Sequence, residues 1–272
     1  MEVHQLKTNQ NYNQMKATYF IIIALVVVNT ATFAQYSRFT TQGVIEYEKK
    51  INTYALIKDQ IKQWDDDSFS KTAFENYQKT NPQFKTVKSK LTFNSTKTVF
   101  KPEEEAVAPS NNWFSLVQTQ QNNIILTNIK DGTNIINKNI YEEKYLITDS
   151  TRKINWKITD EFRNIAGYNC RRANALVMDS IYVVAFYTDQ IAVSGGPETF
   201  NGLPGMILGL ALPHDHITWF ATSVSDTPIT DDKLTIPMKG KAVNNKQLYE
   251  TLKSALKSWG KWANETFKWA ML

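Results

Sequence analysis

Closely spaced turns divide the middle of the chain, and this spacing constrains the fold more than any other feature. Between residues 85 and 224, β-type segments are separated by short turn sequences such as Asp131-Gly132, Asp149-Ser150 and Asp179-Ser180. Strands joined by such short connections lie antiparallel, because a parallel pair needs a crossover of about a dozen residues or more. We therefore predict an antiparallel meander over this region.

Helical periodicity flanks the meander on both sides. Apolar residues spaced three and four apart predict helical segments within residues 56–79, broken near an acidic run at 65–67. A terminal helix, capped by Asn244 or Asn245, is expected to pack on the sheet. Its apolar stripe comprises Leu248, Leu252, Ala255, Leu256, Trp259, Ala263 and Phe267. Trp259, Trp262 and Trp269 are interpreted first as core residues, and a sticky surface is the alternative.

The predicted fold class is therefore mainly β (α+β). It consists of a curved antiparallel β-sheet meander, for which a half-barrel is one form, packed with an N-terminal helical segment and a C-terminal helix. A concave sheet face of this kind can hold an apolar ligand, although fold-level analogy carries no function by itself.

The N-terminus has the layout of a secretory signal peptide. An unbroken apolar run spans residues 19–28, Lys16 precedes it, and a small-x-small site ends at Ala34. A membrane span needs about 20 apolar residues, so the run is too short for an anchor. We predict a signal peptide over residues 1–34 and a single domain over residues 35–272.

Composition excludes several classes of protein. The formal net charge is +5, but the lysines are spread along the chain without a basic run interleaved with aromatics, so nucleic-acid binding is not expected. A single cysteine leaves no internal disulfide, and stability must come from packing of the 7 tryptophans, 12 tyrosines and 14 phenylalanines. No cofactor is predicted.

Five of the ten glycines fall in residues 195–212, together with two prolines. Asn201-Gly202 suits a type I′ turn, and Pro204-Gly205 suits the centre of a type II turn that delivers the chain into an apolar strand. Gly209 leaves one face of that strand small, so an aromatic side chain or the terminal helix can lie across it. A phosphate loop is excluded, because such a loop follows a strand and opens a helix.

Three motifs resemble the bacterial GLPGLI family. They are GYxCxxA at residues 167–173, FYTxxI at 186–191 and GPxxFxGLPGMIL at 196–208. Met206 replaces the usual leucine, and Phe186 stands where tryptophan is common. The resemblance implies a secreted envelope protein without an established activity, located in the periplasm or at the outer membrane. An envelope protein or outer-membrane complex is the implied partner.

The candidate ligand-binding or structural motif combines the turn cluster with the cysteine. Its members are Gly195, Gly196, Pro197, Gly202, Leu203, Pro204, Gly205 and Cys170. If the cluster binds a ligand, exposed backbone groups of its glycines are the expected contact. Cys170 can be a nucleophile, a metal ligand or an intermolecular disulfide partner, but a buried strand residue is the favoured interpretation.

His214 and His216 are the weak metal candidates. Residues two apart in an extended segment point the same way, so both imidazoles can meet one metal, whereas a polar hairpin loop is the plainer account. Three functional hypotheses follow. The first is a non-catalytic binding or interaction protein that takes a partner or an apolar ligand in the sheet concavity. The alternative is a metal-binding or hydrolytic enzyme that uses Cys170 with His214 and His216. A structural subunit beside an outer-membrane complex is a third hypothesis.

Overall fold

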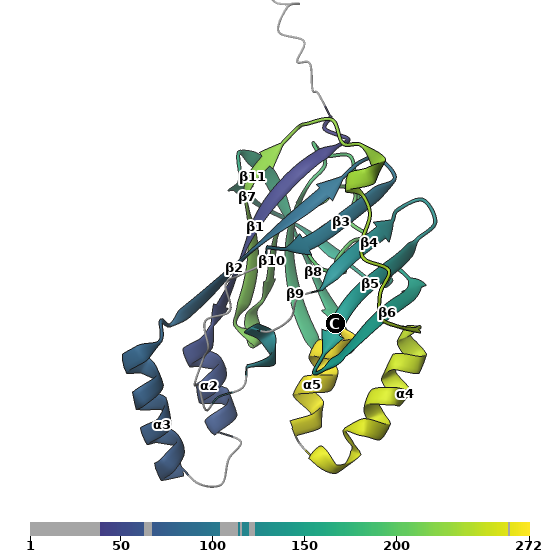
Figure 1. Ribbon diagram of the computed structural model, residues 1–272. Helices are drawn as coiled ribbons and strands as arrows, with labels where there is room; N and C mark the ends of the chain where they lie inside the picture. The colour runs from purple at the N-terminus through teal and green to yellow at the C-terminus, as the bar shows by residue number, and fades with distance from the viewer. Residues whose placement is uncertain (1–38, 63–66, 104–113, 115, 120–122, 261) are drawn as a thin grey trace, which may run out of the picture. The chain divides into compact units, whose positions relative to one another are not determined.

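The computed structural model describes residues 39–272 except 63–66, 104–113, 115, 120–122 and 261 (Figure 1). Phe39–Leu272 forms one compact unit. The predicted signal peptide and most of the acidic run at 65–67 lie outside the described residues.

One sheet contains the twelve strands found in the described part of the chain. The strands are β1 (Gly43–Asn52), β2 (Phe84–Phe93), β3 (Lys97–Pro102), β4 (Ile124–Asn128), β5 (Thr133–Ile140), β6 (Glu143–Ser150), β7 (Lys157–Ile165), β8 (Tyr168–Val177), β9 (Ile181–Thr188), β10 (Met206–Leu212), β11 (Ile217–Ser225) and β12 (Lys241–Val243).

The strand order is β12-β6-β5-β4-β3-β2-β1-β11-β10-β9-β8-β7. Neighbouring strands run antiparallel except β12 and β6, which are parallel. The sheet is not closed, because β12 and β7 stand at opposite ends of this order. The prediction of a mainly antiparallel β fold with helices near both ends is confirmed.

Four α-helices accompany the sheet in the described residues: α2 (Thr53–Ile61), α3 (Asp67–Thr80), α4 (Asn245–Ala255) and α5 (Trp262–Met271). Asn52 caps α2 by accepting a hydrogen bond from the Ala55 amide at 3.1 Å. Asn244 and Gln247 form a reciprocal capping box at the start of α4. Of the two predicted caps, Asn244 is therefore confirmed. None of the described helices has the length and apolar character that a membrane span requires.

The prediction of one continuous terminal helix is wrong. After α4 the chain forms a short 3-10 turn, η5 (Lys257–Trp259), and Gly260 takes a φ of 57°, which ends the helix before α5 begins. The two helices contact each other as a pair (Figure 1). Trp259 from the predicted stripe is therefore 43% exposed, whereas Trp269 on α5 is buried in the core.

One predicted hairpin turn is also placed wrongly. Asp149 and Ser150 lie within β6, and no hairpin follows them, because β7 stands at the far end of the strand order from β6. The predicted single meander is therefore two antiparallel series, β2 to β6 and β7 to β11, with β1 between them. The chain turns at Tyr141 and Glu142, between β5 and β6. Tyr141 adopts a left-handed φ of 54° there. A tyrosine rarely takes this conformation, so its sequence position carried no turn signal.

Buried side chains lie on both faces of the sheet. On the inner face, Tyr47 of β1 is buried and its hydroxyl donates a 2.6 Å hydrogen bond to the carbonyl of Ile207 on β10. On the outer face, Leu234 and Ile236 pack against Val99 of β3. The chain that follows β11 therefore crosses the outside of β3–β5 before β12 joins β6.

Strand β7 returns toward β11, although three strands separate them in the sheet order. The Arg163 guanidinium on β7 lies 4.7 Å from the ring centroid of Phe220 on β11. Beneath them, a Cβ on Gly209 would stand 2.8 Å from both the Ile165 and the Phe220 side chains. An aromatic ring therefore lies across the small face of β10, as one of the two predicted alternatives requires.

Gly205 is expected to tolerate no side chain. An added Cβ would lie 2.1 Å from the Thr188 carbonyl oxygen, and φ is +147°. Gly167→Ala is the matched control, because its φ is +86° but nothing lies within 4 Å. In urea unfolding followed by circular dichroism, we expect Gly167→Ala to cost about 1 kcal/mol. Gly205→Ala should cost at least about 3 kcal/mol, and equal losses would contradict the steric argument.

Candidate functional site

The glycine-proline motif forms the connection from β9 to β10, residues 189–205. Gly195 and Gly196 are buried, whereas Gly202 is exposed. The Gly195 carbonyl accepts a 2.8 Å hydrogen bond from the Ile207 amide, and a Cβ on Gly196 would meet the Phe200 carbonyl oxygen at 2.8 Å. A Cβ on Gly195 would stand 3.0 Å from the Thr98 side chain, so close packing accounts for both buried glycines. Within the same motif, Pro197, Leu203 and Gly205 are buried and Pro204 is exposed.

Both predicted turn types in this motif are wrong. A type I′ turn needs positive φ at two successive residues, but only Gly202 of the pair has it, at 90°. A type II turn would join Met206 to Leu203, whereas the Gly205 amide donates to the Leu203 carbonyl at 2.8 Å. This is a three-residue turn centred on Pro204. This turn is tighter than a type II turn, because Met206 already pairs with Gly195 in an isolated β-bridge.

Cys170 lies on β8 with its side chain fully buried in the core. Its thiol lies 3.5 Å from the Tyr168 carbonyl, to which it donates. Burial raises the pKa of the thiol to about 12. The reactive form of a cysteine is the thiolate. The neutral thiol therefore predominates at physiological pH.

The two histidines have separate partners. His216 Nε2 lies 2.9 Å from Asp59 Oδ2 on α2, and the His214 ring lies 6.2 Å from the Tyr182 ring, centroid to centroid. The described residues contain no group of three or more His, Cys, Asp or Glu side chains placed to hold a metal. Within that part of the chain, the structure does not bring Cys170, His214 and His216 together as a metal site.

The residue between the histidines has a structural role that sequence reasoning missed. Asp215 in η3 (Pro213–Asp215) is buried and accepts a hydrogen bond from Lys268 of α5. This ion pair joins the β10–β11 hairpin to the C-terminal helix pair.

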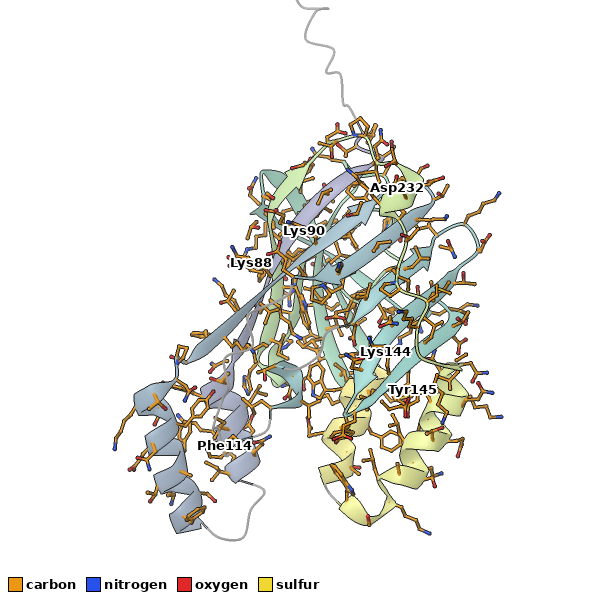
Figure 2. All side chains as sticks on the ribbon, viewed as in Figure 1. Lys88, Lys90, Phe114, Lys144, Tyr145 and Asp232 are labelled. Atoms are coloured by element: carbon orange, nitrogen blue, oxygen red, sulfur yellow. The ribbon has the colours of Figure 1, made fainter. Side chains whose placement is uncertain are left out.

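Buried cations on the inner face are the more informative group, and they were also missed. Lys49 on β1 is 5% exposed and Lys138 on β5 is 3% exposed. Lys138 follows Ile136 at the two-residue period that places side chains on one face. The detectable signal was thus a lysine in register with core residues. Exposed lysines of the usual kind also occur, such as Lys90 on β2 (Figure 2). The Lys90 ammonium pairs with the Glu103 carboxylate at 2.8 Å.

Each of these two lysines, and the half-buried Arg152, donates to a backbone carbonyl. Lys49 Nζ lies 3.1 Å from the Gln118 carbonyl and 5.0 Å from the Trp219 ring centroid. Lys138 Nζ lies 2.8 Å from the Ala270 carbonyl, and Arg152 Nη2 lies 2.5 Å from the Met271 carbonyl. The last two carbonyls belong to the C-terminal end of α5, where the helix dipole favours positive charge.

Glu198 supplies a negative charge to this interior. It lies in the motif connection, holds a left-handed φ of 54°, and accepts a 3.0 Å hydrogen bond from Asn123 Nδ2. A glutamate in this conformation carries local strain. The strained turn places the carboxylate where it attracts both Lys49 and Lys138. In the resemblance motif GPxxF, Glu198 is an unspecified position, which is why the motif did not indicate it.

The charge balance sets the ionisation of Lys138. Burial lowers its pKa to about 8, Glu198 opposes that shift, and the positive charges of Arg152 and Lys49 add to it. Burial also lowers the pKa of Lys49. One carboxylate thus compensates the buried cations incompletely.

A cavity of about 450 Å³ adjoins these cations. Its lining comprises Gly132, Asn134, Ile136, Lys138, Ile147, Asp149, Ser150, Thr151, Arg152, Lys153, Thr199, Asn245, Ala270, Met271 and Leu272. Three of the lining side chains are cationic, and one, that of Asp149, is acidic. Within the wall, Arg152 Nη1 and Asn134 Oδ1 are buried without a hydrogen-bond partner. This volume falls in the range of small-molecule sites, which is roughly 300–1,000 Å³.

Comparison with known proteins gives a family match over part of the chain. A model described as "Protein of unknown function (Porph_ging)" matches residues 176–209, which extend from the end of β8 through the motif connection into β10. No curated protein matches the chain.

The similar solved structures include two crystal forms of PNGF-II, in space groups P21 and C2. Both have a TM-score of 0.47, with 19% and 16% identity, and the matches cover 75% and 76% of this chain. The chain spans 32% of the PNGF-II chain. An uncharacterized conserved protein from Thermus thermophilus matches at a TM-score of 0.36 and 5% identity, covering 76% of this chain and 92% of that one.

The Cys170 thiol is expected to be unreactive in the folded protein. With a pKa of about 12 and a fully buried side chain, it should resist modification by a thiol reagent such as iodoacetamide at pH 8. The same protein in guanidinium chloride is the control and should be labelled completely. Mass spectrometry distinguishes the two states, and rapid labelling of the native protein would show an accessible thiolate instead.

Lys138 is expected to make stability increase with pH. Its folded pKa of about 8 lies below the unfolded value, so the unfolded state binds the extra proton between these pKa values and folding gains free energy as pH rises. From pH 7.5 to 9.5 this group should contribute about 1–2 kcal/mol of unfolding free energy. Urea unfolding at both pH values should show the increment in the wild type and in Lys88→Met, an exposed control. An undiminished increment in Lys138→Met would refute this assignment.

Proposed function

We propose that the chain is a GLPGLI-type protein that is exported to the cell envelope and acts there as a non-catalytic binding protein. Its ligand occupies the cavity lined by Lys138 and Arg152. The observation that carries this proposal is a cavity of about 450 Å³ whose lining includes two cationic side chains from the interior, Lys138 and Arg152.

Energetics support a ligand role for these side chains. Burying a charge costs several kcal/mol, and replacing buried ionic groups by well-packed apolar ones is often neutral or stabilising. Folding alone therefore gains little from Lys138 and Arg152 in this position. A bound ligand of opposite charge would offset the free-energy cost of placing these two cations in the interior, which packing of the protein alone does not.

The surroundings of the cations favour a polar ligand over the purely apolar one expected in the sheet concavity. Ile191, Val193, Phe200 and Leu203 of the motif connection are themselves buried in the main core. The chain thus covers much of its own apolar face, and the cavity that adjoins it carries charged and hydrogen-bonding groups.

For localisation and partners, the proposal is a periplasmic or outer-membrane-associated protein that meets an envelope protein or an outer-membrane complex. The N-terminal apolar run and the motif resemblance support export. Exposed apolar side chains on β7, β8 and the turn after β8 support a docking role: Ile158, Phe162, Leu176 and Met178. No observation favours the metal-binding or hydrolytic alternative, since the Cys170 thiol is neutral and the two histidines have separate partners.

Export is tested by expressing the chain in a bacterium and analysing cell fractions. We expect the mature protein to begin at Gln35 and to appear in the envelope fraction. N-terminal mass spectrometry checks the cleavage position. A chain that keeps residues 1–34 and stays in the cytosol would contradict the proposed location.

Binding is tested with the protein purified from its own envelope and examined by native mass spectrometry. We expect a non-covalent small-molecule adduct on the wild type. Ser150→Trp, which places a large side chain at an exposed lining residue, should lose the adduct. Ser180→Trp on the β8–β9 turn is the matched control and should keep it. An adduct that survives Ser150→Trp unchanged would place the ligand elsewhere.

A further inference from the structure

Large aromatic side chains are exposed on the α4–α5 helix pair and on the β5–β6 turn that contacts it. The exposed fraction is 57% for Tyr141 in the turn, 43% for Trp259 in η5 and 41% for Tyr249 on α4. Exposed apolar groups that gather in one region mark contact surfaces, whereas scattered ones need no explanation. We call the region that carries these three side chains the aromatic surface.

Contacts with the helix pair hold the exposed rings in place. The ring centroids of Tyr141 and Trp259 lie 5.4 Å apart, and the Tyr141 hydroxyl forms a 2.9 Å hydrogen bond with Thr266 Oγ1 on α5. The Tyr249 ring lies 5.2 Å from that of Phe267 on α5. Trp259 belongs to the turn that joins α4 to α5, at the end of the pair away from the sheet (Figure 1). Rings that are fixed and still exposed are ready to contact another surface.

Exposed lysines accompany the aromatic side chains. Lys246, Lys253 and Lys257 are exposed on α4 and η5, and Glu250 is the one acidic residue of these two elements. The Lys253 ammonium lies 5.7 Å from the centroid of the Tyr249 ring. The outward side of α4 and η5 is therefore positively charged.

The β5–β6 turn contributes the opposite charge. Glu142 and Glu143 follow Tyr141, and Lys144 comes next, all of them exposed. The positive excess is thus confined to α4 and η5. Charge alone does not account for a strong interaction at this surface, so the aromatic rings must contribute to it as well.

Tyrosine, tryptophan and lysine together suit the interface of a lipid bilayer. Tyrosine and tryptophan combine an apolar ring with a polar group, and both are enriched at the headgroup level of membranes. Lysine lays its apolar stem along the acyl boundary and keeps its ammonium among the lipid phosphates. Phe162 and Leu176, on β7 and β8, carry no polar group and are less suited to this boundary. The aromatic surface therefore fits a lipid better than the β7–β8 region does.

We propose that the aromatic surface docks on an anionic phospholipid bilayer. Trp259 and Tyr141 place their rings at the level of the headgroups, and Lys253 and Lys257 contact the lipid phosphates. The protein then lies on the bilayer through its helix pair. This inference goes beyond the cavity and its ligand, and it rests on the proposed export only for the membrane that the protein meets in the cell.

Vesicle co-sedimentation tests the lipid with residues 35–272, since the apolar run at 19–28 would itself bind a bilayer. Phe39–Leu272 forms one compact unit, and near-UV circular dichroism checks its fold. We expect vesicles of equal parts phosphatidylglycerol and phosphatidylcholine to bind at least about tenfold more tightly than pure phosphatidylcholine, and sodium chloride to weaken this binding. Equal affinity for both vesicles, or no binding to either, would overturn the proposal.

Two double variants separate a lysine site from net charge. Lys253→Gln with Lys257→Gln should weaken binding to the anionic vesicles at least about tenfold. Lys88→Gln with Lys157→Gln removes the same charge from exposed positions on β2 and β7 and should change the affinity less than about twofold. Equal losses in the two double variants would show attraction by net charge alone and refute the site.

Two aromatic variants test insertion. Trp259→Ser should weaken vesicle binding at least about fivefold, whereas Phe162→Ser, at an exposed position on β7, should leave it within about twofold of the wild type. A loss with Phe162→Ser that matches the loss with Trp259→Ser would contradict the assigned surface.

Export and lipid docking fail separately. Vesicle binding that requires Trp259, in a chain that stays in the cytosol of the cell, would overturn export and support docking. An exported protein that binds neither type of vesicle would overturn docking alone.

Discussion

The return of the chain from β9 to β10 is the constraint on which the inner face of the sheet depends. Residues 189–205 do not turn back directly but contact distant segments on the way. Ile191 bridges to Thr40 before β1, Glu198 bonds Asn123 before β4, and Thr199 donates to the carbonyl of Leu272 at 2.9 Å. The re-entry at Gly205 passes so close to the Thr188 carbonyl that a side chain cannot be accommodated. One connection thus joins the beginning, the middle and the end of the described chain.

The same connection decides the electrostatics of the interior. Its left-handed turn sets Glu198 among the buried cations, and the C-terminal carbonyls of α5 meet Lys138 and Arg152. A low-dielectric interior strengthens these attractions, but it also penalises each polar atom that is left without a partner. The same few side chains therefore decide both how this interior packs and how its charges are compensated.

Much of the strand pattern could be predicted from the sequence, because the alternation of residues and the turns at Asp179 and Gly167 are local signals. The failures have physical causes that are not local. Tyr141 turns in a conformation that tyrosine rarely adopts, and Gly260 divides what periodicity alone presents as one helix. The pairing of β12 with β6 depends on a long crossover, whose destination no short pattern specifies.

The candidate site was less predictable than the fold. Cys170, His214 and His216 attracted attention as chemically versatile residue types, but their environments are a buried strand and a polar hairpin. Lys138 carried a usable signal, since it is a charge at a core-facing position of a strand. Arg152 and Glu198 carried none, because both lie in connections whose course depends on tertiary contacts.

The position of β1 between β2 and β11 has a consequence for how the chain acquires its fold. Glu46 and Ser223 meet on adjacent strands although 177 positions separate them in sequence. Closing so long a segment costs conformational entropy before any contact is gained, and folds rich in such pairings form slowly. We therefore expect the centre of the sheet to assemble only after synthesis has passed β11.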